Sequence, residues 1–511
     1  MSQPAAESRL ASVRDRLREF LPTDAGRAAV LGFYASLLIT FGGLGAGAVR
    51  RDDPLLEMAQ LSWLRFGHGL WLSRLVCIIG VGLMIMAWMR LGRETMAGRA
   101  RLNDLRFVVL AWTAPLLLSV PLFSRDAYSY LAQGALLRDG FDPYAVGPVA
   151  NPGILLENVS SVWTATTCPY GPLFLLIGDG ITKITGDNVV AGTMMFRLAM
   201  LPGLALMMWA IPHIATHLGG KPPVALWLAV LNPLVLIHLI GGVHNELLMV
   251  GLMAAGIALA LERHHGAGIA VVTVGAAIKA TAGIALPFII WIWMIHERQD
   301  REAEGRKPLP PFVMFVKNSA LGGLIFLVIF AGLSLVAGVG IGWLTALSGS
   351  AKIINWLSLP TILAHIVTWF TPLDLSSVLA VTRSLCALAL AAILVWSWWR
   401  YRRTEAEAVM GILVAFVAIV VLSPAALPWY YSWPLALAAG FSLKRSTMAI
   451  MTGLCAWLML IFLPDGNTGL YNLVHVLVVT FVAILAGWSL VKPDPLRVRT
   501  AERYLAEHVD A

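Results

Sequence analysis

Residues 124–172 read SRDAYSYLAQGALLRDGFDPYAVGPVANPGILLENVSSVWTATTCPYGP and form a polar island in a chain that is 58% hydrophobic. Four carboxylates and five prolines lie in this island, with tyrosines and tryptophan between them. A loop of this length and composition, placed between apolar spans, is more often functional than merely connecting. We therefore expect the chemistry of the protein to lie here.

The chain around the island is apolar enough for a membrane, with a mean hydropathy of +0.77 and 13% charged residues. Apolar windows long enough for a helix to cross about 30 Å of hydrocarbon recur along it. These features predict an all-α polytopic membrane protein of about twelve transmembrane helices plus re-entrant or interfacial helices. We expect one integral-membrane domain over residues 1–511, without a separate soluble domain.

The distribution of basic residues predicts an orientation. Arginines and lysines gather in short links beside the spans, as in cytoplasmic loops, so the net charge of +8 does not indicate nucleic-acid binding. The first 25 residues are polar and lack the apolar core of a signal peptide. We expect a multi-pass plasma-membrane protein with both termini cytoplasmic and two extracytoplasmic loops, 124–172 and 339–374.

Two segments are ambiguous. Residues 171–186 are apolar but short, which favours an interfacial or re-entrant helix. Residues 267–295 lie between two basic clusters, and two full spans would need about 40 residues at about 1.5 Å each. Two half-helices broken near residues 279–283 meet both constraints, and such a break must line a cavity or be buried in protein. If both segments are instead single spans, His244 lies inside.

Asp126 is the first candidate for chemistry. It stands where the third predicted span, 106–123, leaves the membrane, which suits a general base for a polar acceptor that arrives from outside. The alternative is an interfacial acid that is solvated or paired with Arg125. Asp142, in the sequence FDPY, is a second acidic candidate, although Asp-Pro is also ordinary turn chemistry.

A second cluster comprises His244, Asn245 and Glu246, which follow two glycines. It is suited to bind a sugar or a phosphate, or it is a helix N-terminus with a capping Asn and a dipole-favoured Glu. No third ligand at a metal-site spacing accompanies it, so we predict no metal site.

Cations within apolar segments form a third group, Arg197, Lys279 and Arg383. Such cations usually face a cavity or a partner. An anionic lipid phosphate is one suitable partner, and a buried carboxylate such as Asp179 is the other. The aromatic run that begins with Trp429 and Tyr430 is either a stacking surface for sugar or prenyl groups or an interfacial belt.

The residues alone leave two classes of function open. An acidic, aromatic outer loop with intramembrane cations suits an enzyme that uses a lipid-phosphate donor. It also suits a transporter or flippase for lipid-linked sugars, in which broken helices and buried charges mark the substrate path. A polymerase or ligase of lipid-linked glycans would share the outer loop.

Several motifs, in order, then identify a resemblance: DAYSYLAQG, GFDPYAVGP, CPYGPLFLLI, NPLVLIHLIGGVHNELLM, AAIKATAGIALPF, GWLTALSGSAKIINWLSLPT and LSPAALPWYYSWPL. Together they resemble the polyprenol-phosphomannose-dependent α-(1→6)-mannosyltransferases of actinobacteria, members of the GT-C superfamily. The resemblance implies an inverting transfer of mannose from polyprenyl-phosphate-mannose onto the α-(1→6)-mannan of lipomannan and lipoarabinomannan. The compact ends lean toward the branch that extends the distal mannan.

The resemblance implies roles for individual residues. The family's catalytic carboxylate corresponds to Asp126, and neither a cofactor nor a metal is expected. One departure is that three predicted spans precede the acidic loop, where the superfamily usually has one, and this leaves the role of a second acid open. The candidates for the donor phosphate are Lys279, His244, Lys352 and Arg383. The candidates for sugar and acceptor contacts are Tyr128, Asp142, Tyr144, Tyr170, Asn245, Glu246, Trp429 and Tyr430.

Overall fold

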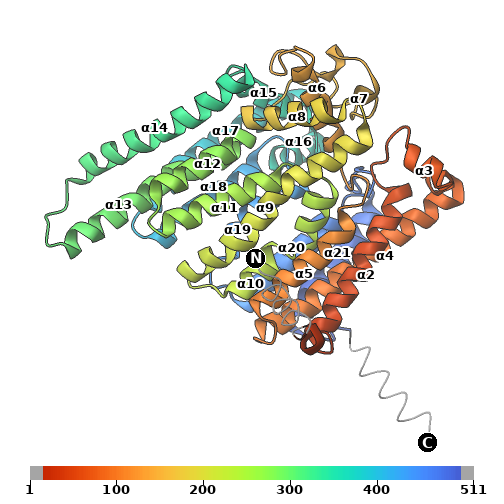
Figure 1. The fold of residues 1–511 in the computed structure, drawn as a ribbon, viewed down its shortest axis with the longest axis horizontal. Coiled ribbons are helices and arrows are strands. Elements are labelled where there is room, and N and C mark those ends of the chain that lie inside the picture. The colour runs from red at the N-terminus through yellow and green to blue at the C-terminus, as the bar shows by residue number, and fades with distance from the viewer. Residues whose placement is uncertain (1–14, 16, 497–511) are drawn as a thin grey trace, which may run out of the picture.

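The structure is a computed structural model that describes residue 15 and residues 17–496. Within these residues the regular secondary structure is helical and no β-strand is present, which confirms the all-α expectation. The polar island does not form an open loop, because its first part is a helix (α6) and short helices follow. Figure 1 shows α6, α7 and α8 gathered at one end of the long helices.

The first half of the chain begins with two long helices, α2 and α4, that pack along each other. Farther on, α6 packs against α8, where Gly134 and Gly178 bring the two backbones into contact. The bounds are α2 (Asp24–Ala46), α3 (Pro54–Met58), η1 (Ser62–Arg65), α4 (Gly67–Met96), α5 (Leu102–Leu116), α6 (Asp126–Arg138), η2 (Pro148–Ala150), α7 (Ile154–Glu157), α8 (Pro172–Thr185) and α9 (Val189–His217).

The middle of the chain is a run of short helices inside the protein. A wide π-helical segment, η3, precedes α11, and α11 packs between α9 and α12. The bounds are α10 (Pro222–Ala229), η3 (Leu234–Gly241), α11 (Glu246–Leu261), α12 (His265–Ile278), the 3₁₀ segment η4 (Ala280–Ala285) and α13 (Leu286–Ala303).

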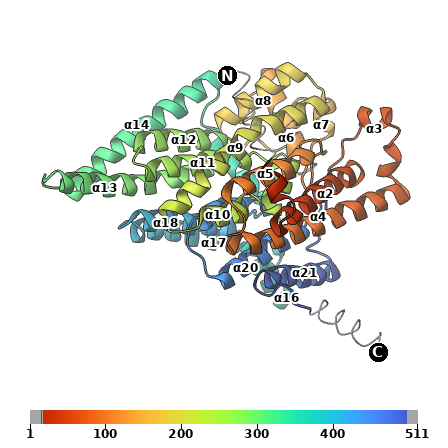
Figure 2. The ribbon, with the colours of Figure 1, turned by 60° about the horizontal axis from the view of Figure 1, so that its bottom comes forward.

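The last part returns to long apolar helices, with α17 packed on α18 and α20 packed on α21. Figure 2 shows α13 and α14 projecting together at one side of the molecule, away from α20 and α21. The bounds are α14 (Pro311–Ala337), α15 (Trp343–Ala346), η5 (Leu347–Lys352), α16 (Leu359–Phe370), α17 (Leu375–Arg400), α18 (Glu405–Leu422), η6 (Pro428–Tyr431), α19 (Ser432–Ala438), α20 (Arg445–Leu460) and α21 (Leu473–Val491).

The count of about twelve spans is not confirmed. Among the described residues, eight helices are long and apolar enough to cross a membrane, or nine if the bent pair α10 and η3 is one span. Of the predicted spans, α5, α11, α19 and α20 are too short in the structure, whereas Ala280–Ala303, predicted as part of a broken segment, is long enough to cross. Only two such helices, α2 and α4, precede Asp126. Much of the two termini, whose cytoplasmic side we predicted, lies outside the described residues.

The two ambiguous segments differ in outcome. Residues 172–185 form the 14-residue helix α8, which does not reach the length of a span. Residues 265–303 are interrupted at Lys279, whose extended backbone separates α12 from η4, and this agrees with the predicted break. The part after the break, Ala280–Ala303, is itself long enough to cross a membrane.

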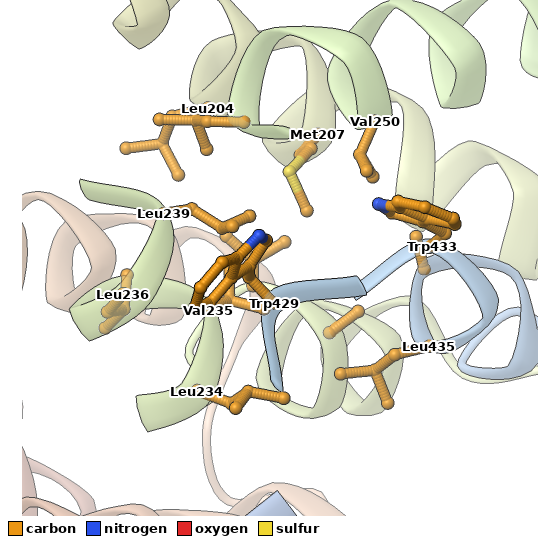
Figure 3. Packing of buried hydrophobic residues seen from close by; sticks show 14 of the residues in the cluster. Leu204, Met207, Leu234, Val235, Leu236, Leu239, Val250, Trp429, Trp433 and Leu435 are labelled. Carbon is orange, nitrogen blue, oxygen red and sulfur yellow. The ribbon is translucent and has the colours of Figure 1, made fainter. Parts of the chain in front are cut away.

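The core that supports the site lies where η3, α9, α11 and α19 meet. Figure 3 shows Trp429 and Trp433, from the η6–α19 region, facing leucine, valine and methionine side chains of η3, α9 and α11. Trp433 is only 2% exposed and Trp429 only 4%. The expectation of a plain interfacial belt therefore does not describe these two tryptophans, because a belt faces the headgroup region.

Candidate active site

The position of Asp126 is fixed by the turn before it. Phe123 has a positive φ of 60°, and its N–H donates to the Pro464 carbonyl at 2.7 Å. The Asp126 N–H donates to Ser124 Oγ at 3.1 Å, so α6 begins at Asp126. A carboxylate in the first turn of a helix lies at the positive end of the helix dipole. The turn thus holds Asp126 at the start of α6.

Arg125 is not the partner of Asp126. Its guanidinium donates to the carbonyls of Asn158 and Val49 at 2.9–3.1 Å. The Asp126 side chain is 16% exposed and remains open on one side. The alternative of an Arg125–Asp126 ion pair is therefore not formed.

The open side of Asp126 faces a cavity of about 190 Å³. Elements far apart in the sequence build its wall: α6, the second half of the polar island, the break at Lys279, and segments near residues 346–353 and 419–433. Its lining residues are Asp126, Ser129, Tyr130, Gln133, Trp163, Thr166, Pro169, Tyr170, Lys279, Ala280, Thr281, Ala346, Leu347, Ile353, Ile419, Ser423, Ala425, Leu427, Tyr430 and Trp433.

Behind Asp126 lies a buried row of charged and polar groups. His244 Nδ1 is 3.6 Å from Asp126 Oδ2 and 3.9 Å from Glu246 Oε2, and both His244 and Glu246 are fully buried. The other oxygen of Glu246 accepts a hydrogen bond from Lys279 Nζ, which lines the cavity. The structure thereby joins Asp126, the HNE cluster and the intramembrane lysine in one site. The carboxylate partner of Lys279 is Glu246, whereas Asp179 pairs with Lys183.

The local fold explains why the HNE cluster points inward. The π-helix η3 ends at Gly241, Val243 has a positive φ of 60°, and α11 begins at Glu246. π-helical turns inside helical proteins occur frequently at functional sites. Asn245 precedes α11 but makes no side-chain cap, and its amide nitrogen and oxygen are buried without a hydrogen-bond partner among the described residues.

Aromatic rings enclose the two central groups of this row. The Trp429 ring stacks on the His244 ring at a centroid distance of 3.9 Å. The Lys279 ammonium lies 4.4 Å from the centroid of Tyr430, 5.2 Å from that of Trp433 and 5.7 Å from that of Tyr170. Such rings attract a cation by cation–π interaction and exclude water from it. Trp429, Tyr430 and Tyr170 therefore belong to the site, as contacts of its histidine and lysine.

The site changes the acidity of its members outside the spans. Burial, and after it the negative charge of Glu246, raise the pKa of the Asp126 carboxyl to about 7, against an opposing effect of Lys279. Burial lowers the pKa of the His244 imidazole well below its usual range, so His244 is neutral. Carboxylates on both sides of Nδ1 favour the tautomer with its proton on that nitrogen. A carboxyl with a pKa near the working pH suits a general base.

Other predicted acceptor contacts lie away from the cavity wall. Tyr128 is buried and donates to the Ala48 carbonyl at 2.5 Å. Tyr144 is also buried and donates to the Tyr170 carbonyl at 2.9 Å. Asp142 is exposed and accepts from the Tyr144 N–H at 2.9 Å, which is the turn chemistry of its alternative interpretation. The structure gives these three residues supporting contacts.

The two remaining phosphate candidates lie at the edge of the site. Lys352 is exposed, and its Nζ lies 3.3 Å from Oγ1 of Thr166, a residue of the cavity wall. Arg383 donates to the carbonyl of Ile353, another wall residue, at 2.8 Å. Lys352 is thus placed to meet a ligand that enters the cavity, and Arg383 supports the wall.

Sequence reasoning missed several wall residues. Ser129 and Gln133 lie three and seven positions after Asp126, and this helical spacing would have placed them on the same face of α6. Trp163, in the polar island, lowers the pKa of Asp126 through a hydrogen bond, although desolvation has the larger effect. Thr281, two residues after Lys279, has a buried hydroxyl without a partner among the described residues. The sequence marked Trp163 only as one of the aromatic residues of the polar island and Thr281 only as part of the predicted break, and it gave neither a role.

Comparison with known proteins places the chain in a family. A family model described as the N-terminal domain of α-(1→6)-mannopyranosyltransferase matches residues 29–295, and a second, the MptB C-terminal domain, matches residues 360–492. The chain belongs to the α-(1→6)-mannopyranosyltransferase family. The first match contains Asp126, the HNE cluster and Lys279, and the second contains Trp429 and Tyr430.

Full-length relatives agree with this assignment. The chain is 53% identical to α-(1→6)-mannopyranosyltransferase A of Mycobacterium tuberculosis, over 95% of this chain and 94% of the relative. It is 38% identical to the enzyme of the same name from Corynebacterium glutamicum, over 88% and 95% of the two chains. It is 31% identical to α-(1→6)-mannopyranosyltransferase B of C. glutamicum, over 79% and 71%. No solved structure matches. The protein is a membrane-embedded mannosyltransferase.

Proposed function

We propose that the protein transfers mannose from polyprenyl-phosphate-mannose to a 6-hydroxyl of an α-(1→6)-mannan chain, with Asp126 as the general base. One observation carries this proposal: a carboxylate with a pKa near 7 lies on the wall of a cavity that also contains a lysine ammonium. A base for the acceptor and a cation for a phosphate are the two groups that such a transfer needs.

The transfer is a single displacement. Asp126 takes the proton of the acceptor 6-hydroxyl while that oxygen forms a bond to C1 of the donor mannose. The bond between C1 and the phosphate oxygen breaks, its electron pair stays on that oxygen, and polyprenyl phosphate leaves. Attack on the face opposite the phosphate converts a β-linked donor into an α-linked product.

The buried groups behind Asp126 orient its carboxylate for this step. An N–H on His244 Nδ1 lies between two carboxylates, at 3.6 Å from Asp126 and 3.9 Å from Glu246. The Trp429 ring fixes the plane of the imidazole. His244 therefore lies behind one oxygen of Asp126, beyond hydrogen-bond distance, and the cavity side of the carboxylate stays free to take the acceptor proton.

The leaving phosphate gains negative charge as the C1–O bond breaks, so a cation must lie where that charge develops. Lys279 is on the cavity wall, and Glu246 on one side and the rings of Tyr430 and Trp433 on the other fix its position. Lys352, near Thr166, is placed to contact the phosphate as the donor enters. Lys279 and Lys352 are therefore the two cations that this chain offers to the phosphate.

The side of the membrane and the biological acceptor are part of the proposal. The polar island and the 339–374 segment both contribute to the cavity wall, through residues such as Asp126, Trp163 and Ile353. Because basic links mark the opposite ends of the spans, we place the cavity at the extracytoplasmic face of the plasma membrane. The acceptor there is the mannan backbone of lipomannan and lipoarabinomannan. Independence from metals stays a prediction.

The test is transfer in purified membranes that contain equal amounts of each variant. Radiolabelled polyprenyl-phosphomannose and a short α-(1→6)-mannoside are incubated with wild type, Asp126→Asn and Asp52→Asn. Asp52 is an exposed carboxylate that does not line the cavity, and its substitution is the matched control. We expect wild type and Asp52→Asn to lengthen the acceptor and Asp126→Asn to be slower by about 10²–10⁴-fold.

The other outcomes separate the parts of the proposal. If Asp126→Asn lengthens the acceptor as fast as wild type, Asp126 is not the base. If wild type transfers from another mannosyl donor and not from the polyprenyl phosphate, the donor is wrong. Movement of labelled lipid between leaflets without a new glycosidic bond would replace the transferase by a flippase, and addition of whole glycans would indicate a polymerase.

A further inference from the structure

A second hollow lies at the far end of α13 from the active site. It is a groove of about 960 Å³ between α13, α14 and the end of α17. Its α13 residues, such as Met294 and Gln299, lie 14 and 19 positions after Ala280 of the active-site cavity. At about 1.5 Å per helical residue the two sites are roughly 20–30 Å apart. The groove therefore belongs to a different end of the molecule.

The floor of the groove is aromatic. Trp291 of α13, Phe315 of α14 and Trp398 of α17 contact one another, with ring centroids 5.0–5.9 Å apart. Trp291 Nε1 donates to the Trp398 carbonyl at 2.9 Å, and Trp398 Nε1 donates to the Pro287 carbonyl at 3.2 Å. These bonds join α13 to α17, so the floor is preformed and apolar.

The rim of the groove is basic. Three arginines and one glutamate line it, which gives a net charge of +2. Arg298 pairs with Glu302 at 2.9 Å, whereas Arg402 and Arg403 form no ion pair with a carboxylate among the described residues. The Arg402 guanidinium lies 3.5 Å from the centroid of the Trp399 ring. Two guanidinium groups thus stand at the rim without an anionic partner.

We propose that this groove binds one phospholipid with an anionic headgroup. The phosphate lies against Arg402 and Arg403, whose planar donor sets match phosphate oxygens, and the acyl chains lie along the Trp291, Phe315 and Trp398 floor. Basic pockets at the ends of membrane spans recognise anionic headgroups in this way. Only five of the 27 residues of α14, which forms one wall, are buried, and Phe312 at its start is 75% exposed. An apolar helix of this kind can face lipid, so acyl chains can reach the groove along it.

The experiment is native mass spectrometry of the full chain purified in detergent. The protein is titrated with phosphatidylglycerol and, separately, with phosphatidylcholine of the same acyl chains. We expect wild type to bind phosphatidylglycerol at least about tenfold more tightly. Arg402→Gln combined with Arg403→Gln should remove that preference. The matched control, Arg90→Gln with Arg101→Gln, removes two exposed cations elsewhere and should keep it.

A third variant guards against misfolding of the arginine double variant. Phe312→Glu changes an exposed rim residue and adds a carboxylate that repels a phosphate, so it should weaken phosphatidylglycerol binding at least about tenfold. The proposal fails if wild type shows no preference for the anionic lipid. It also fails if Phe312→Glu binds like wild type, or if the control pair loses as much binding as the Arg402–Arg403 pair. None of these measurements depends on mannose transfer.

Discussion

Helices α11 and α14 are both apolar, yet their surroundings are opposite. In α11, 14 of 16 residues are buried, whereas in α14 only five of 27 are. Hydropathy measures how favourably a residue leaves water, and both the protein interior and the lipid are environments without water. Apolar character alone therefore does not tell a helix inside the protein from one that faces lipid, so hydropathy alone does not fix the number of spans.

Polar residues make the distinction that hydropathy misses. Asn232, His238, His244, Asn245 and Glu246, around the start of α11, are all fully buried. In α14, Lys317 and Asn318 both donate hydrogen bonds to Glu297, near one end of the helix. A polar group is costly in lipid but can find a partner inside protein, as Asn232 and Glu246 do. The candidate site lies in the buried region, and variants in the two regions should therefore differ.

The largest expected difference concerns ion pairs. Glu246→Ala leaves the buried Lys279 ammonium without its carboxylate, and removal of one member of a buried pair costs about 3–5 kcal/mol. Glu302→Ala breaks an exposed pair with Arg298, which is worth about 0–1 kcal/mol. Unfolding of both variants in mixed micelles, followed by circular dichroism, measures the two losses of stability.

A comparison with Glu246→Gln refines this result, because the amide keeps the shape of the side chain and removes only its charge. We expect its loss of stability to lie between those of wild type and Glu246→Ala. Equal stability losses for Glu246→Ala and Glu302→Ala would mean that the Glu246–Lys279 pair is solvated, and the contrast between the two regions would not hold for charges.

The next difference concerns glycines. A Cβ at Gly251 of α11 would lie 2.3 Å from the Gly203 carbonyl oxygen of α9, so Gly251→Ala forces two helix backbones apart and costs about 1–3 kcal/mol. A Cβ at Gly332 of α14 meets nothing within 4 Å. Gly332→Ala should therefore stabilise the helix by up to about 1 kcal/mol. The opposite signs of the two shifts in unfolding temperature test the comparison, and two shifts of the same sign would contradict it.

The sequence predicted some parts of this molecule and not others for physical reasons. The all-α membrane class follows from composition, and the break at Lys279 follows from the length available between two basic clusters. The conjunction of Asp126 with His244, Glu246 and Lys279 could not be predicted, because it depends on the π-helix η3 and the turn at Val243, which bring distant segments together. The supporting contacts of Tyr128 and Tyr144 could not be predicted either, because an aromatic residue beside an acid occurs in both structural and binding roles.

A third difference concerns pH. With a pKa of about 7, Asp126 is protonated below that pH and cannot accept a proton, so kcat/KM should fall about tenfold for each pH unit below 7. A water-exposed aspartate, with a pKa near 4, would give a flat profile down to about pH 5. Measurement of kcat/KM in membranes from pH 5 to 8 distinguishes the two.

Glu246→Gln sharpens the pH test. The Glu246 charge raises the pKa of Asp126, so its removal should move the acidic limb of the profile to lower pH. Asp52→Asn, which changes an exposed carboxylate that does not line the cavity, should leave the limb in place. A limb that stays near pH 7 in Glu246→Gln would show that another group titrates there.

The smallest difference concerns the two lysines. Lys352 is exposed and contacts the cavity wall only through Thr166, so its interaction with the donor phosphate is screened by water and salt. Lys352→Gln should raise KM for the donor by about three- to tenfold, leave kcat nearly unchanged, and lose this effect at high salt, because an exposed charge contact is worth only about 1 kcal/mol. Lys279→Gln should instead lower kcat at every salt concentration, because the buried lysine acts where the leaving charge develops. A donor titration at two ionic strengths resolves both variants. If Lys352→Gln lowers kcat and Lys279→Gln changes only KM, the phosphate leaves near Lys352 at the edge of the cavity. Lys352 would then stabilise the leaving charge, and Lys279 would only bind the donor.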